Sequence, residues 1–290
     1  MSTIALQRES LRDYLNLTKP RITLLVLITA FAGMWLAAHG LPSPELLVAT
    51  LAGIGLAASS SSTLNNYIDR EVDKRMARTR DRALPARRLQ PEHALAWGII
   101  LGLASFALLA TTVNGISAFL AVGTILFYVG IYTIWLKRTT PLCTSIGGIA
   151  GALPPLIGWT AVTGQFDLVP LALVAILFLW QPPHFWALAL MRVEEYRAAG
   201  FPMLPVVGGE GITKRQMALY TVALVGASLW PYFLGVVGPL YLGIAALLGA
   251  GYLALTAKFI AQPITEKSAK QLFLYSVCYL ALLFSMFFLS

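Results

Sequence analysis

Residues 62–88 read "STLNNYIDREVDKRMARTRDRALPARR", and they follow a run of mostly apolar or small residues at 45–65. A helix of about 20 apolar residues crosses the hydrocarbon core of a bilayer. The stretch therefore places carboxylates and arginines directly behind a run that is long enough to span a membrane. This arrangement predicts a chain that crosses a membrane and collects its charges at one face.

The rest of the composition agrees with a membrane protein. Of the 290 residues, 58% are hydrophobic and only 12% are charged, whereas a soluble domain carries roughly 25% charged residues. Apolar runs of spanning length recur at about 22–40, 45–65, 94–113, 115–136, 142–162, 168–191, 216–237, 239–257 and 271–289. Backbone groups in lipid must bond internally, and runs of about 20 residues suit helices better than the roughly 10-residue strands of a barrel. We predict an all-α polytopic membrane protein with about nine transmembrane helices.

The positions of the cations predict the orientation. All 21 Lys and Arg residues lie in the N-terminal segment or in alternate gaps between the runs. The opposite gaps, "AAHGLPSPE", "TVNG", "AVTGQFD" and "GVVGPL", contain none. Since Lys and Arg are retained on the cytoplasmic side during insertion, the N-terminus, with Arg8, Arg12, Lys19 and Arg21, is expected in the cytoplasm. Anionic lipid and a polyanionic substrate explain the net charge of +8 without nucleic acid.

The charged patch has the residue types of a metal–diphosphate site. If its helix continues past the membrane edge, Asn66, Asp69 and Asp73 lie at i, i+3 and i+7 on one face. Mg²⁺ is typically held by one or two carboxylates together with water and substrate phosphate oxygens. The surrounding cations would take the remaining diphosphate charge: they are Lys74, Arg75, Arg78, Arg80, Arg82, Arg87 and Arg88. The alternative is a solvated loop whose acids and bases pair for solubility.

A related segment follows the sixth run. "PPHFWALALMRVEEYRAAGFPMLP" at 182–205 again passes from an apolar helix to carboxylates, here Glu194 and Glu195, and then to Arg197 and a Leu-Pro turn. Because the two acidic ends lie four spans apart, we predict two four-helix units with a ninth helix appended. Each unit would then offer an acidic helix end on the same side, although Glu194 and Glu195, as adjacent residues on a regular helix, cannot point the same way.

Two further features lie within the predicted spans. Tyr128, Tyr132 and Trp135 at i, i+4 and i+7 would share a helix face just before Lys137 and Arg138. They form an interfacial aromatic belt, a π-rich wall that shelters a carbocation beside a phosphate clamp, or both.

Within the sixth run, His184 follows a Pro-Pro pair, and Trp180 lies one turn earlier. An ionisable residue inside a span defaults to a functional hypothesis, although a packing histidine is the alternative. In "GGIAGALPPLIGW" at 147–159, Pro154 and Pro155 either open a cavity or accompany tight packing of small residues.

These segments carry a family resemblance. "NNYIDREVDKRMARTRDRALP" is similar to the first signature of the intramembrane aromatic prenyltransferase superfamily, Asn-x-x-Asp-x-x-x-Asp. Within that superfamily, "YTIWLKR", "GGIAGALPPLIGW", "QPPHFWALALMRVEEY" and "AAGFPMLPVV" resemble the protoheme IX farnesyltransferase (haem O synthase) family. The resemblance covers about residues 18–290, and we treat 1–290 as a single prenyltransferase domain.

The resemblance implies farnesyl diphosphate as donor, haem B as acceptor, Mg²⁺ as cofactor, and haem O and diphosphate as products. It assigns Mg²⁺–diphosphate binding to the positions of Asn66, Asp69 and Asp73, and a diphosphate clamp to Lys137 and Arg138. It also implies a respiratory cofactor pathway in a bacterial cytoplasmic (inner) membrane, an active site on the cytoplasmic side and a downstream haem A synthase.

Combining the residues with the resemblance gives the full set of candidates. The catalytic candidates are Asn66, Asp69, Asp73 and Lys137; the diphosphate-binding candidates are Arg75, Arg78, Arg82, Lys137 and Arg138. The acceptor-binding candidates are His184, Trp180 and Tyr132; the metal candidates are Asn66, Asp69, Asp73, Glu194 and Glu195. Three alternatives stay open: a quinone-forming prenyltransferase, a membrane transporter, and a haem-binding structural subunit.

Overall fold

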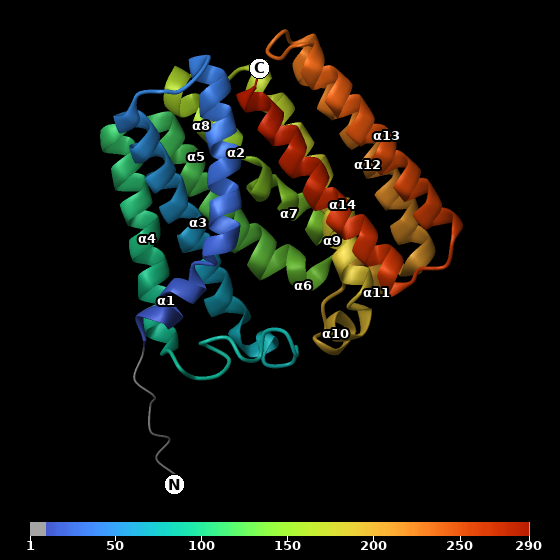
Figure 1. Ribbon diagram of the computed structural model, residues 1–290. Coiled ribbons are helices and arrows are strands. Elements are labelled where there is room, and N and C mark those ends of the chain that lie inside the picture. Colours follow the sequence, from blue (N-terminus) through green and yellow to red (C-terminus); the bar gives the residue numbers. More distant parts are fainter. Residues whose placement is uncertain (1–9, 290) are drawn as a thin grey trace.

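The computed structural model describes residues 10–289, and all regular structure in that range is helical (Figure 1). In chain order the elements are α1 (Leu11–Leu17), α2 (Pro20–Ala38), α3 (Pro44–Asp73), α4 (Pro91–Thr112), α5 (Gly115–Leu126), the π-helix η1 (Phe127–Leu136), α6 (Lys137–Thr139), α7 (Cys143–Ala152), α8 (Pro154–Thr163), α9 (Leu168–Leu190), α10 (Val193–Ala198), α11 (Leu204–Val207), α12 (Gly209–Phe233), α13 (Pro239–Ala261), α14 (Glu266–Ser285) and the 3₁₀ helix η2 (Met286–Phe288). The predicted all-α fold is confirmed.

Long apolar helices make up most of the chain. Eight of them in the described range are long and apolar enough to cross a membrane, with α5, η1 and α6 forming one such helix, α7 and α8 another, and α14 and η2 a third. The remaining predicted span, 216–237, overlaps α12, which has 25 residues and runs alongside the others (Figure 1). The count of nine transmembrane helices stays a prediction, and it depends on whether α12 crosses the membrane.

Helix α3 carries the charged patch out of the apolar layer. Ser43 caps its N-terminus by accepting a hydrogen bond from the Leu46 backbone, and Pro44 occupies the first turn. The helix has 30 residues, so it is about 45 Å long at 1.5 Å per residue, longer than the roughly 30 Å hydrocarbon core. Asp69 and Asp73 therefore lie in its last turns, as the sequence predicted.

The prolines of the fifth span break its helix. α7 ends at Ala152 and α8 begins at Pro154, because proline at the first helical turn needs no backbone donor. Glycines hold this broken helix close to α2. A Cβ atom on Gly158 would collide with the Ala30 carbonyl, and one on Gly33 with the Pro155 carbonyl. The small residues therefore give the tight packing that was one of the two interpretations.

Two main cores organise the bundle. One is built mainly from α2, α3, α4 and α5, and the other mainly from α9, α12, α13 and α14. This division agrees with the predicted pair of units, and α14, which corresponds to the helix predicted to be appended, packs into the second core.

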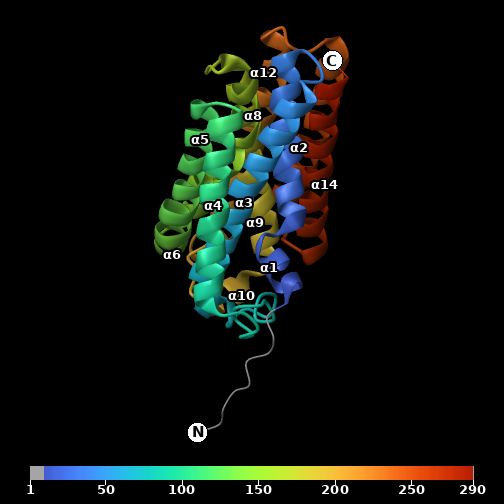
Figure 2. The same cartoon turned by 90° about the vertical axis from the view of Figure 1, so that its left-hand side faces the viewer.

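The charged segments gather at one end of the molecule. Helix α1, the 74–90 segment and α10 lie together there, while the C-terminal end of α14 lies at the opposite end (Figures 1 and 2). The predicted cytoplasmic N-terminus is consistent with this layout but stays a prediction, and Arg8 lies outside the described residues.

Candidate functional site

The carboxylates of α3 point into the protein. Asp69 and Asp73 are buried, together with Asn65 and Asn66 on the preceding turn. Buried carboxylates are retained only when they are paired or bound to metal, because removing a charge from water is costly. The solvated-loop interpretation therefore fails for these two residues, and their partners define the site.

Cations from distant segments meet these carboxylates. Lys137, at the start of α6, forms an ion pair with Asp69, and an Nη of Arg138 lies 3.7 Å from Asp69 Oδ1. Arg82, from the 74–90 segment, donates to Asp73 Oδ2 at 2.7 Å. Three predicted diphosphate-binding cations thus surround the two predicted metal ligands.

The two neighbouring asparagines have different tasks. The Asn65 amide donates to Asp69 Oδ2 at 2.9 Å and to the Thr133 hydroxyl at 3.3 Å. The Asn66 amide donates to the backbone carbonyls of Leu17 and Ser62, while its oxygen accepts from Arg82 at 3.3 Å. The predicted candidate, Asn66, thus reaches Asp73 through Arg82, and Asn65, which sequence reasoning missed, touches Asp69 directly.

Lys19 is a second residue that sequence reasoning missed. Its backbone adopts the left-handed conformation with φ 49° at the start of α2, and its ammonium donates to Asn65 Oδ1 at 2.9 Å. Desolvation, with smaller contributions from Arg82 and Lys137, lowers the pKa of Lys19 to about 7. From the sequence, Lys19 was used only as one of the cations that predict the orientation in the membrane. The feature that could have identified it as a site residue is the Lys-Pro pair at the edge of a span.

The π-helix η1 places the aromatic residues. The rings of Tyr128 and Tyr132 lie 5.1 Å apart, whereas Trp135 is 60% exposed. Bonds in a π-helix run from i to i+5, so its turn is wider than that of the α-helix on which the i, i+7 spacing was based. Tyr132 packs against Gly147 of α7. The prediction that Trp135 shares their face was wrong, and a π-rich wall at this place stays a prediction for the two tyrosines alone.

The second acidic segment differs from the first. Glu194 is exposed and pairs with Arg197, its neighbour at i+3 on α10. Glu195 is half-buried, pairs with Arg192 at 2.9 Å, and its Oε2 is buried without a hydrogen-bond partner among residues 10–289. If a second metal ligand exists in this segment, Glu195 is the better placed of the two.

The structure does not bring Arg75 or Arg78 to the buried carboxylates. Both side chains are exposed on the 74–90 segment. Arg78 lies near Tyr196 of α10, where burial raises the pKa of the tyrosine hydroxyl and the charge of Arg78 opposes that rise. Their predicted contact with diphosphate stays untested, whereas Arg82 is already in place.

The acceptor candidates lie on two helix interfaces. His184 stacks on Trp180 at a centroid distance of 4.3 Å and on Phe273 of α14 at 4.5 Å. Its Nδ1 lies 2.7 Å from the Ser276 hydroxyl. Tyr132 lies instead between η1 and α7. His184 is therefore held between α9 and α14 in an ordered aromatic setting.

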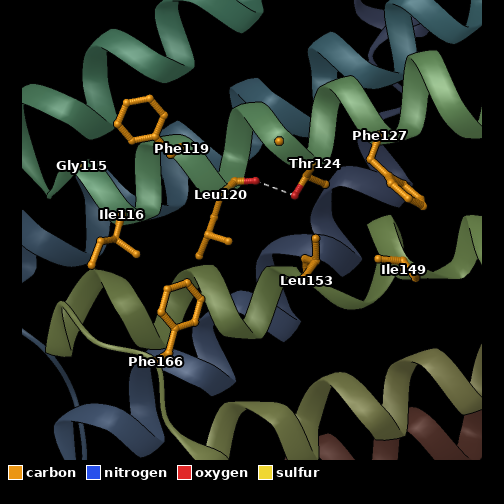
Figure 3. A pocket seen from close by; sticks show the side chains of 10 residues that line it. Gly115, Ile116, Phe119, Leu120, Thr124, Phe127, Ile149, Leu153 and Phe166 are labelled. Atoms are coloured by element: carbon orange, nitrogen blue, oxygen red, sulfur yellow. Dashed lines mark hydrogen bonds between the residues drawn. The ribbon is translucent and has the colours of Figure 1, made fainter.

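A separate apolar groove of about 630 Å³ runs between α5 and the α7–α8 segment (Figure 3). Leu120, Leu153 and Phe166 line it from different segments, and the Thr124 hydroxyl donates to the Leu120 carbonyl. Among residues 10–289, no charged residue lines this groove, so the charged groups that could bind a diphosphate are those at the end of α3.

The carboxylate end of α3 fits a magnesium ion. Asp69 Oδ1 is buried and has no hydrogen-bond partner within the described chain. No cluster of three or more His, Cys, Asp or Glu side chains occurs in residues 10–289, but Mg²⁺ is usually held by one or two carboxylates and by substrate phosphates. Asp69 and Asp73 supply such a set.

The helical bundle, the paired carboxylates and the cationic clamp define an intramembrane prenyltransferase, and the chain belongs to the UbiA prenyltransferase family, which matches residues 26–277. More particularly, it is similar to the protein named protoheme IX farnesyltransferase of Gloeobacter violaceus, with 50% identity over 275 residues that cover 95% of this chain and 90% of the relative.

Solved structures agree on the fold. A digeranylgeranylglyceryl phosphate synthase superposes with a TM-score of 0.82 at 18% identity, covering 96% of this chain and 97% of that one. A UbiA homologue from Archaeoglobus fulgidus, bound to DMAPP and Mg²⁺, gives a TM-score of 0.67 at 17% identity, covering 95% and 99%.

Proposed function

We propose that this protein transfers the farnesyl group of farnesyl diphosphate to a vinyl group of haem B, giving haem O and diphosphate. The ion pairing of Lys137 and Arg138 with buried Asp69 carries the proposal, because cations that can bind a diphosphate then lie beside a carboxylate that can bind Mg²⁺. The 50% identity to a relative named protoheme IX farnesyltransferase supports the choice of donor and acceptor.

On the donor side, the chain stabilises charge that grows on the departing diphosphate. As the allylic carbon–oxygen bond breaks, Lys137, Arg138 and Arg82 can receive the phosphate oxygens by charge-assisted hydrogen bonds. Mg²⁺ bound by Asp69 and Asp73 would supply Lewis-acid stabilisation of the same leaving group. In the structure these cations pair with the carboxylates, so diphosphate binding would exchange one set of ionic partners for another.

The farnesyl cation then needs protection from premature capture by water. Tyr128 and Tyr132 offer negative π faces on the helix η1, which ends directly before Lys137. The acceptor vinyl group attacks the cation and forms the new carbon–carbon bond; water captures the resulting cation and loses a proton, which leaves a hydroxyl on the product. His184 is our candidate for binding the acceptor.

The other functions considered fit less well. A carrier binds its cargo near the bilayer midplane, whereas the buried acids here lie in the last turns of α3. Membership of the UbiA prenyltransferase family argues against a haem-binding structural subunit. A quinone-type acceptor has no iron for His184 to bind, so it would not explain why the His184 ring is held by Trp180, Phe273 and Ser276. A haem A synthase that consumes the product stays a prediction.

We place the site at the cytoplasmic face of an integral membrane protein, in the bacterial inner membrane. Cysteine labelling in oriented vesicles tests this placement. In a Cys278→Ser background, Arg80→Cys should react with an impermeant maleimide only from the cytoplasmic side, and Gln165→Cys only from the opposite side. Reaction of both from one side would overturn the orientation.

Reconstitution tests the activity itself. Purified protein in lipid nanodiscs is mixed with haem B, farnesyl diphosphate and Mg²⁺, and the porphyrin products are weighed by mass spectrometry. We expect a mass increase of one farnesyl group plus one hydroxyl group. A matched reaction replaces haem B by 4-hydroxybenzoate; prenylation of that acid, with none of haem B, would overturn the proposal.

A further inference from the structure

The ring of His184 is fixed on three sides. The planes of Trp180 and Phe273 lie at 22° and 27° to it. The Trp180 indole, one turn before His184 on α9, also donates to the Ser276 carbonyl of α14 at 2.7 Å. Among residues 10–289, Nδ1 has a hydrogen-bond partner, whereas Nε2 has none.

The hydrogen bonds of Ser276 decide which nitrogen carries the proton. Its hydroxyl lies 2.6 Å from the Phe273 carbonyl, which can only accept. The single hydroxyl hydrogen is therefore directed to that carbonyl, and the oxygen accepts from His184 Nδ1 at 2.7 Å. A neutral imidazole that is protonated at Nδ1 has its lone pair on Nε2.

We propose that Ser276 is a positioning residue that holds His184 as the Nδ1–H tautomer, so that Nε2 is presented to the iron of the porphyrin acceptor. The inference rests on the proposed function, since it names the atom by which the acceptor is held. Metal-ligating histidines commonly donate their other ring N–H to an oxygen acceptor, which fixes tautomer and orientation. Trp180 and Phe273 fix the ring plane in the same way.

Nitrogen NMR tests the tautomer without any ligand. The chain has three histidines, so protein labelled with ¹⁵N-histidine in lipid bilayers gives few imidazole signals, and His184→Ala assigns one set. We expect the parent to show a protonated Nδ1 and a bare Nε2 at His184. Ser276→Ala should mix the tautomers, and Ser276→Thr should retain the parent pattern. A bare Nδ1 in the parent would overturn the inference even if Ser276→Ala fails to fold.

A matched control separates this role from helix packing. Tyr279 lies one turn further along α14, and its hydroxyl donates to the Ser228 hydroxyl of α12 at 2.7 Å. Within the described part of the chain, Tyr279 makes no hydrogen bond or ring contact with His184. Tyr279→Phe thus removes another intramembrane hydrogen bond of the same helix. It should leave the His184 signals unchanged; an equal disturbance by both variants would reduce Ser276 to a packing residue.

Haem titration tests the functional consequence. Loss of such a supporting bond typically weakens metal affinity about 10-fold or more. Ser276→Ala should therefore weaken haem B binding by about that factor and leave farnesyl diphosphate affinity unchanged, while Ser276→Thr and Tyr279→Phe bind like the parent. His184→Ala should change the haem absorption spectrum.

The product assay keeps the two proposals apart. If the parent makes farnesylated porphyrin while His184→Ala binds haem with the parental spectrum, iron ligation is overturned and the proposed function stands. If the spectra and the NMR pattern depend on Ser276 as expected but no product forms, the proposed function is overturned and the tautomer inference is supported.

Discussion

The two acidic segments of this protein look alike in sequence but differ in structure. Asp69 is 1% exposed and pairs with Lys137, which is 68 residues away in the chain. The side chain of Glu194 is 82% exposed and pairs with Arg197, three residues away. The carboxylates of the first segment lie in the last turns of the long helix α3, where they are buried. Those of the second segment lie on the short helix α10.

This difference indicates how much each ion pair contributes. Exposed pairs at i, i+3 add roughly 0–1 kcal/mol, whereas removing one partner of a buried pair costs about 3–5 kcal/mol. The end of α3 therefore holds opposed charges in a fixed geometry, suited to a metal and a polyanion. The α10 segment is largely a solvated surface, except for the buried oxygen of Glu195.

The strongest test of the comparison is Asp69→Asn. It keeps the volume but removes a charge that both Lys137 and a dication need, so turnover should fall by roughly 100-fold or more. Glu194→Gln is the matched control and should stay within twofold of the parent. Both variants are purified, checked by size-exclusion chromatography and assayed for prenylated product; near-normal turnover of Asp69→Asn at saturating Mg²⁺ would refute the metal assignment.

Lys137→Met should mainly weaken the donor. It removes a charge-assisted contact worth about 1.5–3 kcal/mol, so the Kd for farnesyl diphosphate with Mg²⁺ should rise roughly 10- to 150-fold. Arg138→Ala should have a smaller effect, because the Arg138 side chain is 42% exposed. Isothermal titration gives both values. Haem binding should be unchanged; a selective loss of haem binding in Lys137→Met would contradict the assignment.

Lys19 should make donor binding depend on pH. Burial beside Arg82 and Lys137 lowers its pKa to about 7, and a bound diphosphate would raise that pKa by adding negative charge. Binding above pH 7 therefore takes up a proton, and affinity should fall by up to about 10-fold per pH unit as pH rises from 7 to 9. Below pH 7, Lys19 is already protonated and contributes no further dependence.

Calorimetry in buffers of different ionisation enthalpy measures this proton uptake at pH 8. Lys19→Met removes the group and should abolish the uptake that it causes. Uptake of the same size in Lys19→Met would show that another residue titrates. The variant also tests whether Lys19 belongs to the site at all, since its only assigned role from sequence was orientation.

The smallest change in turnover is expected at Glu195 of α10, with Glu194 as its control. Glu195→Gln should lower turnover by roughly 2- to 10-fold, the range of one ordinary hydrogen bond, because Glu195 is half-buried with one unpartnered oxygen. Glu194→Gln should change nothing measurable. Steady-state assays at varied Mg²⁺ decide the point, and equal effects of the two variants would mean that α10 takes no part in metal binding.

The sequence by itself determined the features that depend on local pattern. Run length and composition predicted the helices, and charge placement put the polar groups at one end. The periodicity of α3 correctly placed Asp69 and Asp73 on its inner face, because an α-helix repeats regularly. The same rule failed for Trp135, where the chain forms a π-helix whose wider turn changes the spacing.

Tertiary structure alone decided which of several similar residues take part. It chose Asn65 rather than Asn66 to contact Asp69, added Lys19, separated Glu195 from Glu194, and joined His184 to Ser276. Lys19 and Asn65 are 46 residues apart, and His184 and Ser276 are 92 apart. Local periodicity fixes which face of a helix a residue occupies, but contacts at such separations depend on how whole helices pack.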